Sequence, residues 1–297
     1  MNRLFSVLLL VLTPLMTKAE NSMLTTAGLP IWDSAPLLYL VEQQPLSDKG
    51  ITFDFQPWHA PEELGAALAR ADIQIASTPG ILAPIFSAKG LKLSLLGTSA
   101  PAGNIKILSR NNGGEIAVPF KGGMPDLILR SLETVNDLKP RYTGTPPEAM
   151  QLFLAGQVSA AFLAEPLATA VSLQSKEPVE TRDACALWKS AHGVKHCPAT
   201  GVYMGVAMDG RDAELIGRAL ENAYIALAYD PEKAASLLKA QFAALERAPL
   251  VPAFQRMTPA FQNMCETTWL NQTLQALESV VPFALTSETL LSVQCKD

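Results

Sequence analysis

The stretch that decides the fold runs from Glu115 to Gly123 and reads EIAVPFKGG. Its apolar run followed by paired glycines predicts a buried strand that ends in a turn and leads into a helix. Pro147–Met150 then begins a second helix, which ends at Gly156 and leads into an apolar strand that closes on Glu165-Pro166. Two such units present both strand ends to one crevice, which is where open α/β sheets bind ligands.

These two units resemble the core of the second lobe in periplasmic substrate-binding proteins of ABC importers, of the nitrate, sulfonate and thiamine-precursor type. The resemblance implies a type II α/β fold of two lobes, with a discontinuous first lobe, an inserted second lobe and a helical C-terminal tail. It also implies that the crevice closes on a small solute and that an inner-membrane permease receives it. The expected domains are a signal peptide over residues 1–19, the first part of lobe one over 20–109, lobe two over 110–201, and the return to lobe one with the C-terminal helices over 202–297.

The N-terminal residues predict a cleavable secretory signal peptide. Arg3 precedes an apolar run from Leu4 to Met16, and small residues flank the expected cleavage point after Ala19. A retained membrane helix is the alternative, but the run is shorter than the roughly 20 apolar residues that span a bilayer. We therefore expect a protein exported to the periplasm.

Composition narrows the class of protein. The chain has 297 residues, of which 48% are hydrophobic and 17% are charged, and this balance suits an α/β protein whose sheets are covered by helices. A net charge of -5 without a basic run argues against nucleic acid as a partner. We expect a monomer that binds a small molecule and docks on a permease.

Strands and helices alternate over the first part of the chain, which predicts a mostly parallel sheet with helices on both faces. The glycine-bearing segment Ser109–Gly114 marks the expected first crossing between lobes, and Gly201–Met208 reads as the strand that returns to lobe one. Within these crossings we expect the hinge at Arg110–Gly114 and Gly201–Met204. The strands predicted before the first crossing are Met23–Leu29, Ile51–Phe55, Ile73–Ala76, Leu91–Gly97 and Ile105–Leu108.

The four cysteines favour disulfides, because an exported chain with an even cysteine count is typically oxidised. Proximity in the sequence favours the pairs Cys185–Cys197 and Cys265–Cys295 among the three possible connectivities. The alternative is a metal site of His192, His196 and Cys197, since the histidines share an i, i+4 spacing. Gly193 lies between them and weakens a continuous helix there.

Catalysis has little support in this sequence. There are three histidines, the cysteines are assigned to disulfides, and no phosphate-binding or dinucleotide-binding glycine motif is present. We therefore expect a binding protein without a cofactor, not an enzyme.

Polar and aromatic residues at strand ends are the candidate ligand-binding residues. Several have structural alternatives: Trp32 as a core residue, Ser34 as a helix cap, the glycines as a simple turn, and Glu165-Pro166 as a strand end. Trp58 precedes Pro61 so closely that we assign it to the start of a helix. The candidates are Trp32, Asp33, Ser34, Ser77 and Thr78 in lobe one, and Phe120, Gly122, Gly123 and Glu165 in lobe two.

Charge at the candidate site favours a small organic amine or nitrogen heterocycle, because Asp33 and Glu165 lie beside aromatic residues. Lys121 acts in the opposite direction, and a sulfonate or other oxyanion is the rival. The sequence also leaves open a ligand-sensing module for a membrane receptor, or an exported metal-binding protein.

Overall fold

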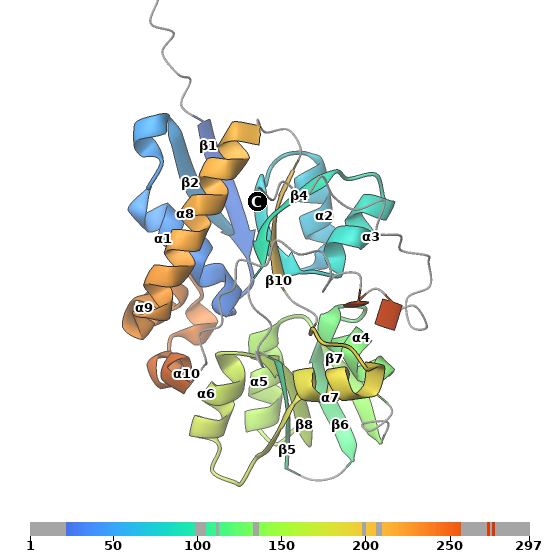
Figure 1. Ribbon diagram of the computed structural model, residues 1–297. Coiled ribbons are helices and arrows are strands. Elements are labelled where there is room, and N and C mark those ends of the chain that lie inside the picture. Colours follow the sequence, from blue (N-terminus) through green and yellow to red (C-terminus); the bar gives the residue numbers. More distant parts are fainter. Residues whose placement is uncertain are drawn as a thin grey trace, which may run out of the picture.

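The computed structural model describes residues 22–98, 105–110, 113–132, 137–197, 200–205 and 210–256, with 272–273 and 275–276. These residues form two lobes, one above the other in Figure 1, and each lobe contains a five-stranded sheet. The expected signal peptide and the Cys265–Cys295 pair lie outside the described residues. Within the described ranges, every helix is too short or too polar to cross a membrane.

The sheet of lobe one has the order β2-β1-β3-β10-β4. Strand β1 is parallel to both of its neighbours, whereas β10 is antiparallel to β3 and β4. Because β10 follows the whole second sheet in the sequence, lobe one is discontinuous. The strands are β1 (Ser22–Gly28), β2 (Ile51–Pro57), β3 (Ile75–Pro79), β4 (Leu93–Thr98) and β10 (Thr200–Gly205).

The sheet of lobe two has the order β7-β6-β8-β5-β9 and repeats the same arrangement. Strand β6 is parallel to β7 and β8, and β5 is antiparallel to β8 and β9. In each sheet the antiparallel strand between two neighbours is the one that enters from the other lobe. The strands are β5 (Ile105–Ser109), β6 (Gly114–Pro119), β7 (Leu138–Thr143), β8 (Ala160–Ala164) and β9 (Glu180–Asp183).

Helices cover both faces of each sheet (Figure 1). Because strand side chains alternate between faces, Ile75 and Ala76 enter different hydrophobic clusters, as do Leu163 and Phe162. One cluster includes α1 (Ala35–Gln43), α8 (Gly210–Ala228), α9 (Pro231–Gln241), α5 (Pro146–Leu154), α6 (Leu167–Gln174) and α10 (Leu250–Arg256). The other includes α2 (Pro61–Ala69), α3 (Leu82–Ala88), α4 (Met124–Ser131) and α7 (Ala184–His192).

This architecture confirms the predicted α/β class with two lobes and a discontinuous first lobe. One boundary differs from the expectation, because Ile105–Ser109 pairs with β8 and β9 and belongs to the second sheet. The first crossing therefore lies between β4 and β5, and the hinge expected at Arg110–Gly114 is inside lobe two. Gly113 and Gly114 have φ angles of +87° and +99°, and Gly114 is the first residue of β6.

Candidate ligand-binding site

A cavity of about 90 Å³ lies between the two lobes. It sits beyond the carboxyl ends of β1, β2, β3 and β6, so the topology that builds the sheets also places the cavity. The walls are mostly apolar, and both lobes contribute to them. Lobe one supplies Leu29, Asp33, Trp58 and Leu82, and lobe two supplies Phe120, Met124, Ile128 and Phe162.

Trp58 is the largest side chain that lobe one contributes to the cavity. It follows β2 and is only 1% exposed, and its indole N–H donates to the backbone oxygen of Ser77 at 3.2 Å. This bond satisfies the polar end of the indole and leaves its ring to form the wall. The assignment of Trp58 to a helix start overlooked this role, because β2 extends to Pro57 and carries the ring to the sheet edge.

Phe120 faces Trp58 from lobe two. The two rings are stacked, with centroids 5.8 Å apart and planes inclined by 29°. Phe120 has a φ angle of +59°, which is uncommon for a residue with a bulky side chain. Such strained conformations persist where the surrounding structure holds them, and they cluster at ligand clamps.

Asp33 places a carboxylate in the wall of this cavity. It lies in the short 3-10 helix η1 (Trp32–Ser34), is 5% exposed, and is the one ionisable side chain among the described residues that line the cavity. Its position also affects α8: the pKa of Tyr224 is raised well above its ordinary value by burial and, to a smaller extent, by the charge of Asp33.

Ser34 has a structural role beside Asp33. Its hydroxyl donates to the backbone oxygen of Leu29 at 2.5 Å, and no side-chain cap bond is formed at the start of α1. A Cβ atom at Gly28 would lie 2.1 Å from the Ser34 Oγ, so glycine is required for the close approach of η1 to the end of β1. This contact fixes the loop that carries Asp33.

Ser77 and Thr78 lie at the end of β3 and are 2% and 1% exposed. The backbone oxygen of Ser77 accepts the Trp58 indole bond. The Thr78 hydroxyl is buried without a hydrogen-bond partner among the described residues. Neither side chain lines the cavity itself, although the adjacent Pro79 does.

The turn at Phe120–Gly123 uses its amides internally. The N–H of Gly122 donates to Asp126 Oδ2 at 2.7 Å, and the N–H of Gly123 donates to the Phe120 oxygen at 2.9 Å. Asp126 is 1% exposed, and its Oδ1 also accepts from the Tyr142 hydroxyl and pairs with Arg130. Gly123 lines the cavity, whereas Gly122 does not.

Trp32 and Glu165 meet across the lobes through their backbones, because the Trp32 N–H donates to the Glu165 oxygen at 3.3 Å. The indole of Trp32 packs on Phe254 of α10, with centroids 5.2 Å apart. The Glu165 carboxylate accepts from the backbone N–H and the hydroxyl of Thr169 at the start of α6. Burial raises the pKa of Glu165, while the Thr169 bonds act to lower it. Neither side chain lines the cavity.

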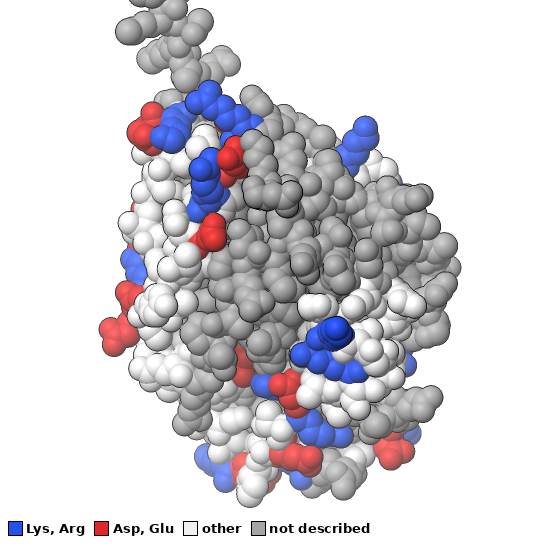
Figure 2. All heavy atoms as spheres, viewed as in Figure 1, with Lys and Arg blue, Asp and Glu red and all other residues white. Residues whose placement is uncertain are grey.

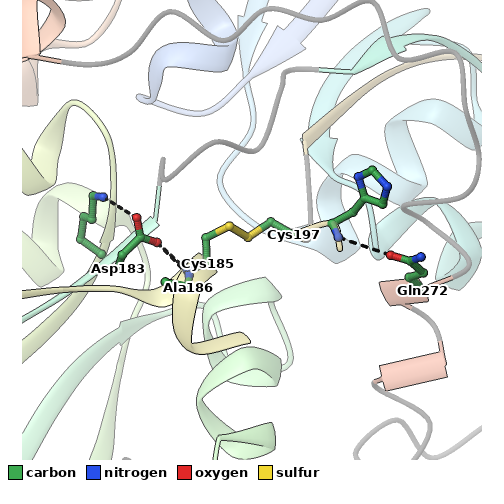
Figure 3. The surroundings of a disulfide bond; sticks show 7 residues. Asp183, Cys185, Ala186, Cys197 and Gln272 are labelled. Atoms are coloured by element: carbon green, nitrogen blue, oxygen red, sulfur yellow. Dashed lines mark hydrogen bonds and ion pairs between the residues drawn. A yellow bond between two sulfur atoms is a disulfide. The ribbon is translucent and has the colours of Figure 1, made fainter. Parts of the chain in front are cut away.

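The disulfide Cys185–Cys197 is formed, and both cysteines line the cavity. Figure 3 shows the bridge joining α7 to the segment that leads back to lobe one. On either side, Asp183 accepts from the backbone amides of Cys185 and Ala186, and His196 donates its amide to Gln272. The bridge therefore fixes one wall of the cavity close to the second crossing.

The two histidines of the metal alternative do not share a helix face. Helix α7 ends at His192, and Gly193 follows in the left-handed conformation with a φ angle of +62°. His192 Nε2 lies 3.1 Å from the Ser131 hydroxyl, and its ring packs on Trp188. Burial lowers the pKa of His192. In the part of the chain that the structure describes, no three His, Cys, Asp or Glu residues form a metal-binding group.

The sequence matches no family model and no curated protein. Solved structures do match: an ABC transporter from Parabacteroides distasonis has a TM-score of 0.73 at 18% identity, covering 92% of this chain and 99% of that chain. The periplasmic aliphatic sulphonate-binding protein of Escherichia coli has a TM-score of 0.70 at 17% identity, with 91% of each chain covered. The alkanesulfonate-binding protein of Xanthomonas axonopodis pv. citri bound to MOPS has a TM-score of 0.67 at 17% identity, covering 92% and 99%. At these identities the likeness shows the fold, which is that of periplasmic binding proteins.

Proposed function

We propose that this chain is the periplasmic solute-binding component of an ABC-type importer. It captures a small organic solute between its two lobes and delivers it to an inner-membrane permease. The observation that carries the proposal is the cavity between the lobes, whose walls come from the strand ends of both sheets. The fold shared with binding proteins of transporters supports the same role.

Residues of this cavity suit binding better than catalysis. Trp58, Phe120, Met124 and Phe162 supply apolar walls, and Asp33 is the ionisable group beside them. A nucleophile with a neighbouring base would be required for most hydrolytic or transfer reactions. We therefore propose a binding protein that acts without a cofactor.

Surface charge is consistent with a partner other than nucleic acid. In the view of Figure 2, basic and acidic side chains are interspersed over the described surface. A nucleic-acid-binding protein typically concentrates Lys and Arg on one face. We propose that the protein acts as a monomer that docks on its permease after the lobes close.

A thermal-shift screen of small organic solutes on the secreted protein tests this function, followed by X-ray scattering with the strongest ligand. A ligand at 100 times its dissociation constant should add about 2.7 kcal/mol to the free energy of unfolding. We expect the radius of gyration to fall as the lobes close. Uptake of that ligand by cells should require both this chain and a permease.

A matched pair of variants locates the binding site. Trp58→Leu removes an aromatic ring from the cavity, and Tyr229→Leu removes one from a surface position that is 86% exposed. Only the first should weaken ligand binding. Equal affinities in both variants, or a ligand that binds without any change in scattering, would contradict the proposal.

A further inference from the structure

We propose that the solute is a small organic cation, an amine or a quaternary ammonium whose apolar part fills the cavity. This inference rests on the proposed function and specifies the chemical class of ligand for the same site. Three features carry it: an aromatic wall, one buried carboxylate that lines the cavity, and a helix start that carries a carboxylate of the protein itself.

The aromatic wall suits a cation. Trp58 and Phe120 line the cavity from opposite lobes, with their ring centroids 5.8 Å apart and their planes inclined by 29°, and Phe162 lines the same cavity. Aromatic faces attract ammonium groups through their quadrupoles, and the attraction is stronger where the cation is desolvated. The rings also bury the methyl or methylene groups that surround such a cation.

Asp33 supplies the opposite charge. It is 5% exposed and lines the cavity, so its carboxylate interacts with a ligand where water screens the charge weakly. An anionic ligand would instead place two negative charges in one small space. Charge therefore selects for cations within the cavity.

The start of α4 is poorly suited to an anion. Asp126 Oδ2 takes the N–H of Gly122, and Pro125 has no N–H to give. Lys121, the nearest cationic residue in the sequence, lies with its ammonium 5.7 Å from the centre of the Tyr142 ring, and it does not line the cavity. The carboxylate of Asp126 in the first turn of α4 also opposes the positive end of the helix, which disfavours a sulfonate or nitrate there.

Cavity volume limits the size of the cation. A water molecule requires roughly 10–15 Å³ of such a volume, so the cavity of about 90 Å³ accommodates about six to nine non-hydrogen atoms. Benzylamine, cyclohexylamine and butyltrimethylammonium fall in or near this range. They are suitable probes because each joins one positive charge to an apolar group.

Calorimetry with these three cations, with neutral benzyl alcohol, and with the anions benzoate and ethanesulfonate tests the inference. We expect at least one cation to bind tenfold or more tightly than benzyl alcohol, and the anions to bind more weakly still. Asp33→Asn should weaken binding of that cation about thirtyfold while leaving benzyl alcohol nearly unchanged. Asp48→Asn, the same change at an exposed position, should have no effect on binding.

Each other outcome overturns the inference. Binding of an anion without binding of any cation would exclude the cationic class, yet closure of the lobes on that anion in scattering would leave the proposed function standing. Equal binding of a cation and benzyl alcohol, or unchanged cation binding in Asp33→Asn, would exclude the charge pairing. If none of the three cations binds, the cationic ligand class is excluded, and the wider solute screen then tests the proposed function separately.

Circular dichroism and thermal unfolding of Asp33→Asn establish that the variant is folded. Comparison of Trp58→Phe with Trp58→Leu gives a second measurement of the aromatic wall.

Discussion

The indole of Trp58 stacks on the ring of Phe120 across the boundary between the two lobes, with the centroids 5.8 Å apart. Trp58 is held by its bond to Ser77 in lobe one, and Phe120 is held in a left-handed conformation at the end of β6 in lobe two. The pair therefore joins two separately positioned rings. A second link between the lobes is the backbone bond from Trp32 to Glu165.

Removing either ring should reveal coupling between the lobes. Trp58→Leu and Phe120→Leu should each destabilise the protein, and the double variant should lose less than the sum. The expected coupling is about 0.5–1.5 kcal/mol, the usual contribution of a stacked aromatic pair beyond its buried area. Urea unfolding of the four proteins measures it.

Phe242→Leu provides the control for this cycle. Phe242 packs against Phe55 within lobe one, so its loss should add to that of Trp58→Leu without coupling. Equal coupling in both cycles would show that the effect comes from general destabilisation and not from the contact between lobes.

The Cys185–Cys197 bridge should stabilise the protein and hold the cavity wall in position. Replacing both cysteines by alanine opens a link between residues 12 apart in sequence, and the free energy of unfolding should fall by about 3 kcal/mol. Ligand affinity should also fall, because both cysteines form part of the cavity wall. Differential scanning calorimetry and ligand titration measure the two effects. An unchanged affinity would show that the wall keeps its shape without the bridge.

Gly28→Ala should disturb the loop that carries Asp33. The new Cβ would lie 2.1 Å from the Ser34 Oγ, so the contact between β1 and η1 must open, at a cost of about 1–3 kcal/mol. Because the clash is with Ser34, the double variant Gly28→Ala/Ser34→Ala should be more stable than the sum of the two single changes. Gly97→Ala, where no atom lies within 4 Å of the new Cβ, should change stability by less than about 0.5 kcal/mol.

Stability should depend on the ionisation of Glu165. Burial raises its pKa above the ordinary value of 4.5, so the native state binds a proton more tightly than the unfolded chain. The contribution of this group to the free energy of unfolding is therefore largest at low pH and falls as pH rises through the raised pKa. Glu165→Gln removes this contribution, and the stability of the variant relative to the unmodified protein should increase as pH rises from about 4.5 through the raised pKa. Urea unfolding at intervals of pH measures the difference, and a constant difference would contradict the expectation.

The sequence pattern was sufficient to predict the strands that are buried on both faces. The run that ends at Pro119 and the run that ends at Ala164 are uninterrupted and apolar, and both form central strands of lobe two. Strand β7 was not predicted because four of its six residues are exposed and Pro140 lies within it, as an edge strand permits. Strand β9 is also an edge strand, and its four residues, Glu180–Asp183, are polar, so it was not predicted either.

The contacts between the lobes were harder to predict than the strands. The glycines at 113 and 114 look like a linker between lobes in sequence, but both lie inside lobe two. The missing side chain of Gly114 makes room there for Ser159, whose hydroxyl donates to the backbone oxygens of Gly113 and Glu115. The cavity depends on side chains brought together from distant segments. Trp58 and Phe120 show no shared spacing that reveals their contact, whereas Asp33 could be selected because it follows a strand end.

Asp126 should be required for the turn that positions Phe120. Its carboxylate accepts from the Gly122 N–H at 2.7 Å and from the Tyr142 hydroxyl at 3.0 Å, and it pairs with Arg130 on the next turn of α4. Asp126→Ala should lower the free energy of unfolding by about 1–2 kcal/mol, because a buried acceptor at a helix start is lost. Glu214→Gln, which breaks an exposed pair with Arg218 at the same i, i+4 spacing, should cost no more than about 0.5 kcal/mol.

A second measurement, the titration of Tyr142, separates the role of Asp126 in this turn from general destabilisation. The pKa of Tyr142 is raised first by burial and then by its hydrogen bond to Asp126 and the charge of that group, so it should fall toward 10.0 in Asp126→Ala. Ultraviolet titration of the folded variant measures the shift, and an unchanged tyrosine titration would show that Asp126 does not act on this turn through Tyr142.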